Sequence, residues 1–337
     1  MRILIIDPQF EAEPDVERSV TGPEPEIVVW QTAERGDVPP SEFAQCDALI
    51  NCRSRHGVTR AIVAAMTRCK IVSQAGVGFN HIDLVACAER GIPVCNTPDY
   101  GTTEVADHAL GLTLSLVRGI VAYDAKLRAR TMGWDARSQG TVRRLRGATF
   151  GVLGLGRIGT AAALRARGFE MNVVFCDPYL PAGAERAFGF RRVDTAEELM
   201  AQSDIVSVHT PLTPETTGIV GHRTLAAAKP GLIVVNTSRG GTIDLDAVEA
   251  ALRDGRLGGA AFDVLPTEPL TYDHPLIQAF AASEPWLDGR LIITPHAAFY
   301  SPDSVIDMRR IATQNVFNYL TQGVLRSCVN ADLLKKH

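Results

Sequence analysis

Residues 148–168 read ATFGVLGLGRIGTAAALRARG, and this stretch decides the fold. Gly154, Gly156 and Gly159 form a GxGxxG pattern directly after an apolar run and at the start of an alanine-rich segment. In a strand–turn–helix unit, the first glycine allows the tight turn, the second lets the backbone approach a pyrophosphate, and the third lets helix and strand pack closely. The pattern predicts a dinucleotide site, although glycines alone can also serve only to shape a turn.

Asp177 lies where a dinucleotide-binding unit carries the carboxylate that binds the ribose. The next apolar run, NVVFCDPY, contains Asp177, twenty-one residues after Gly156. In this place a carboxylate accepts hydrogen bonds from both ribose hydroxyls of the adenosine half and repels a 2′-phosphate. We therefore expect NAD rather than NADP. NADP stays an alternative, because three arginines, which suit a 2′-phosphate, follow shortly after Asp177 in the sequence: Arg186, Arg191 and Arg192.

The composition fits two ordinary globular domains. The chain has 337 residues, of which 46% are hydrophobic and 21% charged, with a formal net charge of −4. This charge does not predict a nucleic-acid partner, and no apolar run is long enough to predict a membrane span. Seven cysteines without a CxxC pair indicate reduced thiols in the cytoplasm, with neither disulfides nor a metal site. The opening MRILIIDP predicts a first strand rather than a signal peptide.

Short β-branched runs alternate with alanine- and leucine-rich stretches of helical length, which predicts an α/β fold with parallel sheets. Five candidate strands in the first hundred residues predict a small doubly wound domain: 2–6, 26–30, 48–51, 70–73 and 92–95. Six more predict a full dinucleotide-binding sheet: 149–153, 172–176, 204–208, 232–236, 259–262 and 291–294. We expect a last helix at 304–323, capped by Ser301 or Asp303, to pack back on the first domain.

Three polar residues follow three successive strands of the second series. Arg239 follows LIVVNTS, Glu268 follows AAFDV in the segment LPTEP, and His296 follows LIITP. Reduction of a 2-oxo acid needs a cation for the carboxylate, an acid that protonates the forming alkoxide, and a group that holds this acid; arginine, histidine and glutamate meet these needs. Singly, each has a plainer interpretation, as a surface arginine, a turn or core histidine, and a loop glutamate. Their joint placement favours a catalytic set.

These motifs together resemble the D-isomer-specific 2-hydroxyacid dehydrogenase family over nearly the whole chain. The resemblance is carried by GLGRIG, NTSRGGTID, GGAAFDVLPTEP and TPHAAF. In that family the residues at the positions of Arg239, Glu268 and His296 are the catalytic set. Arg239 is therefore expected to bind the substrate carboxylate, His296 to act as general acid and base, and Glu268 to orient His296.

The resemblance also implies a domain organisation. Residues 1–98 and 300–337 are expected to form a smaller, flavodoxin-like substrate domain, and residues 99–299 an inserted NAD-binding Rossmann domain. Dimerisation of two identical chains through the NAD-binding domain is implied in the same way. We expect no regulatory domain of the phosphoglycerate dehydrogenase type after the last helix.

Further positions match the family's ligand contacts. The cofactor-binding residues implied are Gly154, Gly156, Arg157, Ile158, Gly159, Asp177, Thr102, His209, Thr210, Pro211, Thr237 and Asp263. Asp263 is expected to accept a hydrogen bond from the nicotinamide carboxamide. Gly76, Val77 and Gly78, in QAGVGFNHID, resemble the family's second contact with the substrate carboxylate, made by backbone N–H groups; the plainer interpretation is a simple turn.

Within the family the likeness is greatest to the C-terminal-binding-protein branch, through CDPYLPAGAERAFGF, HAAFYS and SCVN. Corepressors of that branch have arginine at the position of Gln74 and tryptophan at that of Phe299, so their substrate preference does not transfer to this pocket. Glu268 disfavours formate, because formate-oxidising relatives have glutamine there. Arg53, in NCRSRHGVT, is either solvated surface or a contact for a second anionic group of the substrate. Two functions stay open: a reductase of 2-oxo acids, and an NAD(H)-sensing interaction protein with weak catalysis.

Overall fold

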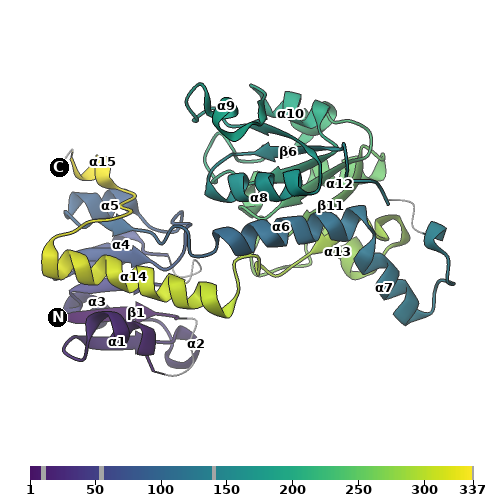
Figure 1. Ribbon diagram of the computed structural model, residues 1–337. Coiled ribbons are helices and arrows are strands. Elements are labelled where there is room, and N and C mark those ends of the chain that lie inside the picture. Colours follow the sequence, from purple (N-terminus) through teal and green to yellow (C-terminus); the bar gives the residue numbers. More distant parts are fainter. Residues whose placement is uncertain (9–12, 53–56, 139–141, 336–337) are drawn as a thin grey trace. The chain divides into compact units, whose positions relative to one another are not determined.

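The computed structural model describes residues 1–8, 13–52, 57–138 and 142–335, so Arg53 lies outside the described residues. The chain divides into two compact units. Unit 1 consists of Met1–Gly101 and Tyr300–His337, and unit 2 of Thr102–Phe299. Each unit is built around its own sheet, and the strands of both sheets pair in parallel (Figure 1). The expected α/β fold with two doubly wound parallel sheets is confirmed.

The sheet of unit 1 has the strand order β2-β1-β3-β4-β5, which is the flavodoxin-like order. Its strands are β1 (Arg2–Ile6), β2 (Glu26–Trp30), β3 (Ala48–Asn51), β4 (Ile71–Gln74) and β5 (Val94–Cys95). The bounds of the first three match the sequence prediction. β4 is shifted by one residue, and β5 is shorter because only its last two residues pair with β4.

The helices in the described part of unit 1 are α1 (Asp15–Thr21), α2 (Thr32–Arg35), α3 (Pro40–Gln45), α4 (Arg60–Ala65), α5 (Leu84–Glu89), α14 (Pro302–Gln322) and α15 (Ala331–Leu334). α14 packs against α1, β3 and β4, as expected for the last long helix (Figure 1). The residue that caps it is Ser301, whose hydroxyl oxygen accepts a hydrogen bond from the backbone N–H of Ser304 at 2.9 Å.

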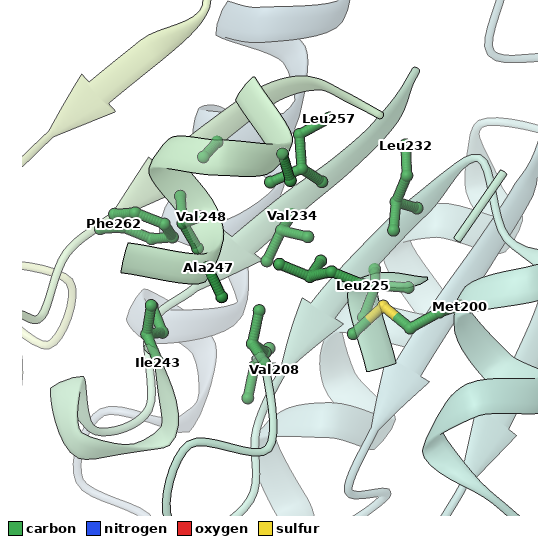
Figure 2. Packing of buried hydrophobic residues seen from close by; sticks show 14 of the residues in the cluster. Met200, Val208, Leu225, Leu232, Val234, Ile243, Ala247, Val248, Leu257 and Phe262 are labelled. Carbon is green, nitrogen blue, oxygen red and sulfur yellow. The ribbon is translucent and has the colours of Figure 1, made fainter. Parts of the chain in front are cut away.

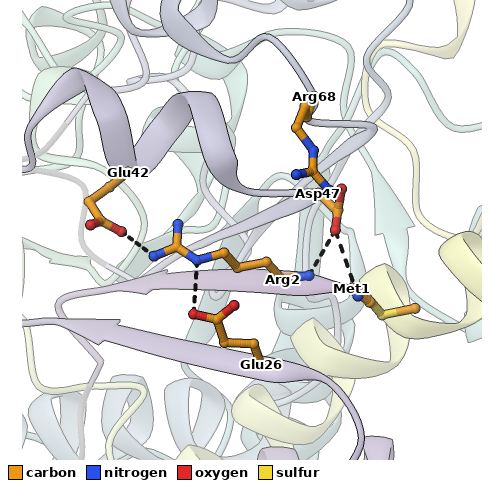
Figure 3. Close-up of polar contacts among 6 residues, drawn as sticks. All are labelled: Met1, Arg2, Glu26, Glu42, Asp47 and Arg68. Atoms are coloured by element: carbon orange, nitrogen blue, oxygen red, sulfur yellow. Dashed lines mark hydrogen bonds and ion pairs between the residues drawn. The ribbon is translucent and has the colours of Figure 1, made fainter.

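Charged side chains tie together the amino-terminal ends of the strands in unit 1 (Figure 3). The guanidinium of Arg2 donates to Glu26 at 3.1 Å and to Glu42 at 2.7 Å. Asp47 accepts from the backbone N–H of Arg2 and from the guanidinium of Arg68, both at 2.8 Å. Ligands of parallel sheets bind at the opposite, carboxyl-terminal ends of the strands, so we assign this network a structural role.

The sheet of unit 2 has the order β12-β11-β10-β9-β6-β7-β8. Its strands are β6 (Thr149–Leu153), β7 (Asn172–Cys176), β8 (Arg191–Arg192), β9 (Ile205–Val208), β10 (Leu232–Asn236), β11 (Leu257–Phe262) and β12 (Leu291–Ile293). The expected count of six strands was incomplete. β8 was missed because it consists of two arginines at the sheet edge and has no apolar run. The strand order reverses between β6 and β9, and at such a point open α/β sheets bind their ligands.

Helices cover both faces of this sheet. They are α6 (Thr102–Val117), α7 (Ile120–Ala129), α8 (Arg157–Gly168), α9 (Ala184–Phe188), α10 (Ala196–Gln202), α11 (His222–Ala226), α12 (Leu245–Arg253) and α13 (Pro275–Ala281). Alternate residues of one strand enter opposite cores: Val234 of β10 belongs to one buried cluster and Val235 to the other. Figure 2 shows Val234 near Ala247 and Val248 of α12. The burial of both faces explains why the strands of this sheet are apolar runs without alternation.

α6 and α7 are separate helices that meet at a bend. α6 buries Leu112, Leu116 and Val117, whereas α7 leaves Ile120 and Val121 about half exposed, at 54% and 50%. Among the described residues no single helix has the length and apolar character required to cross a membrane. The pair of α6 and α7 meets that test jointly, with an angle of 59° between them.

Candidate active site

The glycine-rich loop between β6 and α8 contains three glycines. At two of them a side chain would clash with the protein, and the third faces open space. Gly154 has φ +90°, and a Cβ there would lie 2.9 Å from a side-chain carbon of Thr210. A Cβ on Gly159 would lie 2.1 Å from the carbonyl oxygen of Gly154. A Cβ on Gly156 would meet nothing within 4 Å. This open space beside the amino-terminal end of α8 fits a pyrophosphate.

Asp177 is fixed beside this loop. Its carboxylate accepts hydrogen bonds from the backbone N–H of Leu155 at 2.9 Å and of Tyr179 at 3.0 Å, and the residue stays partly exposed. The guanidinium of Arg192 donates to the backbone carbonyls of Asp177 at 2.7 Å and Leu180 at 3.1 Å. Arg192 thus shapes the loop that presents Asp177, and the carboxylate keeps an accessible side for a ribose.

Three buried polar atoms follow β9 and β10 and have no hydrogen-bond partner among the described residues: His209 Nδ1, Thr210 Oγ1 and Thr237 Oγ1. Burial lowers the pKa of His209 to about 4, so its ring is neutral at physiological pH. An unsatisfied buried polar group costs about 1–3 kcal/mol, and a ligand with matching polar groups removes this cost. Together with the glycine loop and Asp177, these atoms fit a bound dinucleotide.

Arg239 lies in the loop after β10 and is partly buried. The loop is held by Asn236, which is fully buried; its Nδ2 donates to the carbonyl of Arg239 at 3.0 Å, and its Oδ1 accepts from the backbone N–H of Ser238 at 2.9 Å. A Cβ on Gly240 would lie 1.9 Å from the carbonyl oxygen of Leu265. The loop of Arg239 therefore packs directly on the segment after β11. Sequence reasoning missed Asn236, for which the only signal was an amide at the end of a buried strand.

Glu268 and His296 form a hydrogen-bonded pair. Glu268 Oε2 lies 2.7 Å from His296 Nδ1, and Glu268 Oε1 accepts from the backbone N–H of Leu265 at 3.0 Å. Burial alone would raise the pKa of Glu268. The hydrogen bond and charge of His296, the N–H of Leu265 and the charge of Arg239 outweigh burial and hold this pKa below its usual value. Glu268 is thus a carboxylate at neutral pH, so Nδ1 of His296 donates to it and Nε2 is left for another partner.

The turn that carries His296 has an unusual backbone. His296 has φ +53°, in the left-handed region, which costs a non-glycine residue about 1–2 kcal/mol. Its N–H donates to the carbonyl of Asp263 at 2.8 Å. The carboxylate of Asp263, only 2% exposed, accepts from Thr294 Oγ1 at 2.6 Å and from the N–H groups of Ala297 and Ala298 at 2.8 and 2.9 Å. Hydrogen bonds to a charged group contribute about 1.5–3 kcal/mol each, enough to offset the strain. This structural task of Asp263 could not be predicted from the sequence.

The other residues of unit 2 that are expected to contact a ligand lie at helix starts and in loops. Thr102 is the first residue of α6, Arg157 and Ile158 open α8, and Pro211 follows Thr210 on the exposed side of its loop. The ring of Phe299 lies edge-on to the imidazole of His296, with 6.2 Å between centroids.

In unit 1, the turn after β4 is tied to the residues after β5. The N–H of Gly76 donates to Thr97 Oγ1 at 2.5 Å, and the Nδ2 of Asn96 donates to the carbonyl of Val77 at 2.8 Å. The N–H of Gly76 is thus used within unit 1.

Comparison with known proteins agrees with this geometry. Residues 110–298 match the model of the D-isomer specific 2-hydroxyacid dehydrogenase family, NAD binding domain. The chain belongs to the D-isomer-specific 2-hydroxyacid dehydrogenase family. The resemblance inferred from the sequence motifs is thereby confirmed, and so is NAD as the cofactor of the unit that contains them.

Relatives of this chain include two longer curated proteins. It is 33% identical to the D-3-phosphoglycerate dehydrogenase of Archaeoglobus fulgidus over 332 residues, 98% of this chain and 59% of the relative. It is 36% identical to that of Methanocaldococcus jannaschii over 330 residues, with the same coverage of both chains. The chain thus spans about three fifths of the length of these curated relatives.

Solved structures are similar over the full length of this family member. The TT0316 protein from Thermus thermophilus has a TM-score of 0.80 and 31% identity, covering 98% of this chain and 100% of that one. The D-lactate dehydrogenase from Aquifex aeolicus, crystallised with NAD and lactic acid, has a TM-score of 0.80 and 26% identity, covering 99% and 98%.

Proposed function

We propose that this chain is an NAD-dependent dehydrogenase that reduces small 2-oxo acids to D-2-hydroxy acids and catalyses the reverse oxidation. The observation that carries the proposal is the 2.7 Å contact between Glu268 Oε2 and His296 Nδ1, in a unit that matches the family's NAD-binding domain. This contact fixes the histidine ring and leaves Nε2 for proton exchange. The loop of Arg239, which packs against the segment preceding Glu268, adds the cation that a 2-oxo acid needs.

Each residue of the set has one task. The guanidinium of Arg239 binds the substrate carboxylate through two parallel hydrogen bonds and so fixes which face of the carbonyl is presented. Glu268 orients the ring of His296 and favours its protonated form. His296 Nε2 donates a proton to the carbonyl oxygen as it becomes a hydroxyl, and accepts this proton in the reverse direction. NADH, when bound, supplies the hydride, so that a 2-oxo acid, NADH and one proton give a 2-hydroxy acid and NAD⁺.

The residues around the glycine loop hold the cofactor in this proposal. Gly154, Gly156 and Gly159 admit the pyrophosphate, and Asp177 binds the ribose hydroxyls and disfavours a 2′-phosphate. The remaining contacts are assigned to Arg157, Ile158, Thr102, His209, Thr210, Pro211, Thr237 and Asp263. The unpartnered buried atoms of His209, Thr210 and Thr237 support this assignment.

Further residues are assigned to the substrate in this proposal. Backbone N–H groups of the turn formed by Gly76, Val77 and Gly78 give a second contact to the carboxylate. Phe299, beside the His296 ring, contacts the rest of the substrate.

We propose that Arg53 binds a second anionic group on the substrates that carry one. Arg53→Ala is then expected to raise KM for 2-oxo acids with an acidic side chain and to leave KM for uncharged ones unchanged. Steady-state kinetics with both classes checks this. An equal rise for both classes would show that Arg53 binds no second anion.

The assembly is proposed to be a homodimer formed through the NAD-binding unit, in the cytoplasm. Figure 1 shows α7 extending away from the sheet of unit 2. Its exposed apolar side chains include Ile120 at 54% and Val121 at 50%, and Trp134, further along, is 95% exposed. Such a surface suits a second copy of the chain. The seven cysteines are free thiols, six of them buried, which suits a reducing compartment.

The test is oxidation of NADH in the presence of a panel of 2-oxo acids with apolar, acidic and phosphorylated side chains. Efficient turnover of at least one, lost in His296→Gln, is the result expected. Tight binding of NADH without turnover of any member would instead favour the NAD(H)-sensing interaction protein.

A further inference from the structure

The turn that carries His296 is anchored by a chain of hydrogen bonds that begins on α6. His108 Nε2 lies 3.0 Å from Thr294 Oγ1, and Thr294 Oγ1 lies 2.6 Å from Asp263 Oδ1. The carboxylate of Asp263 then accepts from the two backbone N–H groups that follow His296, while the carbonyl of Asp263 accepts from the N–H of His296 itself. A side chain on α6 is thus linked to the position of the proposed acid.

The direction of these hydrogen bonds follows from their chemistry. An ionised carboxylate only accepts, so the single hydroxyl proton of Thr294 points to Asp263. The oxygen of Thr294 must then accept from His108, which therefore carries a proton on Nε2. Nε2 of His108 also lies 3.6 Å from Asp263 Oδ1. The partial positive charge of this N–H therefore stabilises the ionised form of Asp263 directly.

His108 lies between Val105 and Leu112 along one side of α6. Those two residues, three before it and four after it, are 8% and 5% exposed, whereas the side chain of His108 is 27% exposed. His108 thus lies at the edge of the buried side of α6, where the contact with Thr294 holds its ring.

We propose that His108 and Thr294 are positioning residues for the proton transfer by His296. The proposal rests on the proposed function, because it takes His296 as the general acid. The backbone of His296 is left-handed, and Asp263 holds it there. If Thr294 and His108 no longer orient this carboxylate, the turn shifts, Nδ1 moves away from Glu268 and Nε2 loses its alignment. Small displacements of a reacting group are costly to the rate.

Three variants of side-chain hydroxyls give the first test. Thr294→Val is expected to lower kcat for reduction by roughly 10–100-fold and to change the Kd of NADH much less, because Asp263 is only one of the assigned cofactor contacts and the glycine loop is not disturbed. Thr294→Ser keeps the hydroxyl and should restore most of the rate. Thr113→Val is the matched control: it removes a buried hydroxyl of α6 that bonds only to the backbone of Ala109, and kcat should stay at the wild-type value. A wild-type kcat in Thr294→Val, or the same loss in Thr294→Ser, would overturn the proposal.

A second pair of variants tests His108. The amide of His108→Gln can still donate to Thr294, whereas His108→Leu cannot. We expect kcat near wild type for the first and a loss smaller than that of Thr294→Val for the second, because Thr294 can still reach Asp263. Equal rates for His108→Leu and wild type would remove His108 from the chain.

A spectroscopic signature separates this proposal from the proposed function. The Nδ1–H proton of a histidine bound to a carboxylate gives a far-downfield proton NMR signal, which can be followed without substrate. It should be present in the wild type and Thr294→Ser and lost in Thr294→Val. If no 2-oxo acid is turned over, the proposed function fails and this signal still tests the positioning. If the signal is unchanged in Thr294→Val, the positioning role fails whatever the activity.

Discussion

The two sheets use an aspartate at a strand end in opposite ways. In unit 1, Asp7 follows β1 and is 2% exposed, because its carboxylate accepts from the backbone N–H of Thr32 at 2.6 Å and from the hydroxyl of Thr32 at 2.8 Å. In unit 2, Asp177 follows β7 and accepts from two backbone N–H groups but stays partly exposed. The same side chain is enclosed in a loop in one unit and stays accessible in the other.

The neighbouring polar residues repeat this contrast. In unit 1, the buried Gln74 Oε1 lies 3.0 Å from Asn51 Nδ2 and 2.8 Å from His81 Nε2, so its polar atom is used within the protein. In unit 2, the buried atoms His209 Nδ1 and Thr237 Oγ1 have no partner in the described part of the chain. The polar atom of Gln74 is thus satisfied within the protein, whereas these two atoms of unit 2 are not.

The largest effect is expected at the proton donor of unit 2. His296→Gln removes the group that exchanges the proton but keeps a side chain of similar length. We expect kcat to fall by about 10²–10⁴-fold while the Kd of NADH stays the same. Stopped-flow kinetics and NADH fluorescence titration measure the two. Loss of NADH binding without a slower chemical step would contradict the assigned role.

A smaller effect is expected at the carboxylate contact. Arg239→Lys keeps the charge but loses the planar pair of donors, so kcat/KM for 2-oxo acids should fall by about 10–100-fold. Arg239→Ala should cost more than Arg239→Lys in the same assay. Unchanged kcat/KM in both variants would assign the carboxylate to another residue.

The aspartate comparison can be tested with a matched pair. Asp177→Ala should weaken NADH binding by about tenfold, the loss of one to two hydrogen bonds to a charged group, and should raise the affinity for NADPH relative to NADH. Asp7→Ala should leave both affinities unchanged and lower Tm, because its buried carboxylate accepts hydrogen bonds from the backbone and hydroxyl of Thr32 in unit 1. Equal effects of the two substitutions on NADH binding would break the comparison.

The smallest expected effect is the change of kcat with pH. The lowered pKa of Glu268 keeps it ionised throughout the neutral range, so its charge supports the protonated His296 there. Reduction takes up a proton and oxidation releases one, so reduction should slow as pH rises and oxidation should quicken. Glu268→Gln should reduce the rate of reduction most at the alkaline end. Profiles of kcat in both directions check this, and parallel profiles for the two directions would exclude His296 as the acid and base.

The parts of this fold that local patterns encode could be predicted. Apolar runs such as those of β6 and β10 mark buried parallel strands, and the carboxyl ends of such strands share one edge, which is why the residues after β10, β11 and β12 could be grouped. β8 has no apolar run, so only its pairing with β7 reveals it. The roles of Asn236, Asp263 and Thr294 depend on which backbone groups lie near them in space. No sequence pattern encodes those contacts.

The measurement that tests the central claim most directly is a crystal structure of the chain with NAD and oxamate, an unreactive analogue of a 2-oxo acid. We expect the carboxylate of oxamate on the guanidinium of Arg239 and its carbonyl oxygen within hydrogen-bond distance of His296 Nε2, with Glu268 still on Nδ1. Oxamate bound without contact to either residue, or a His296 ring turned away from Glu268 in that complex, would contradict the account.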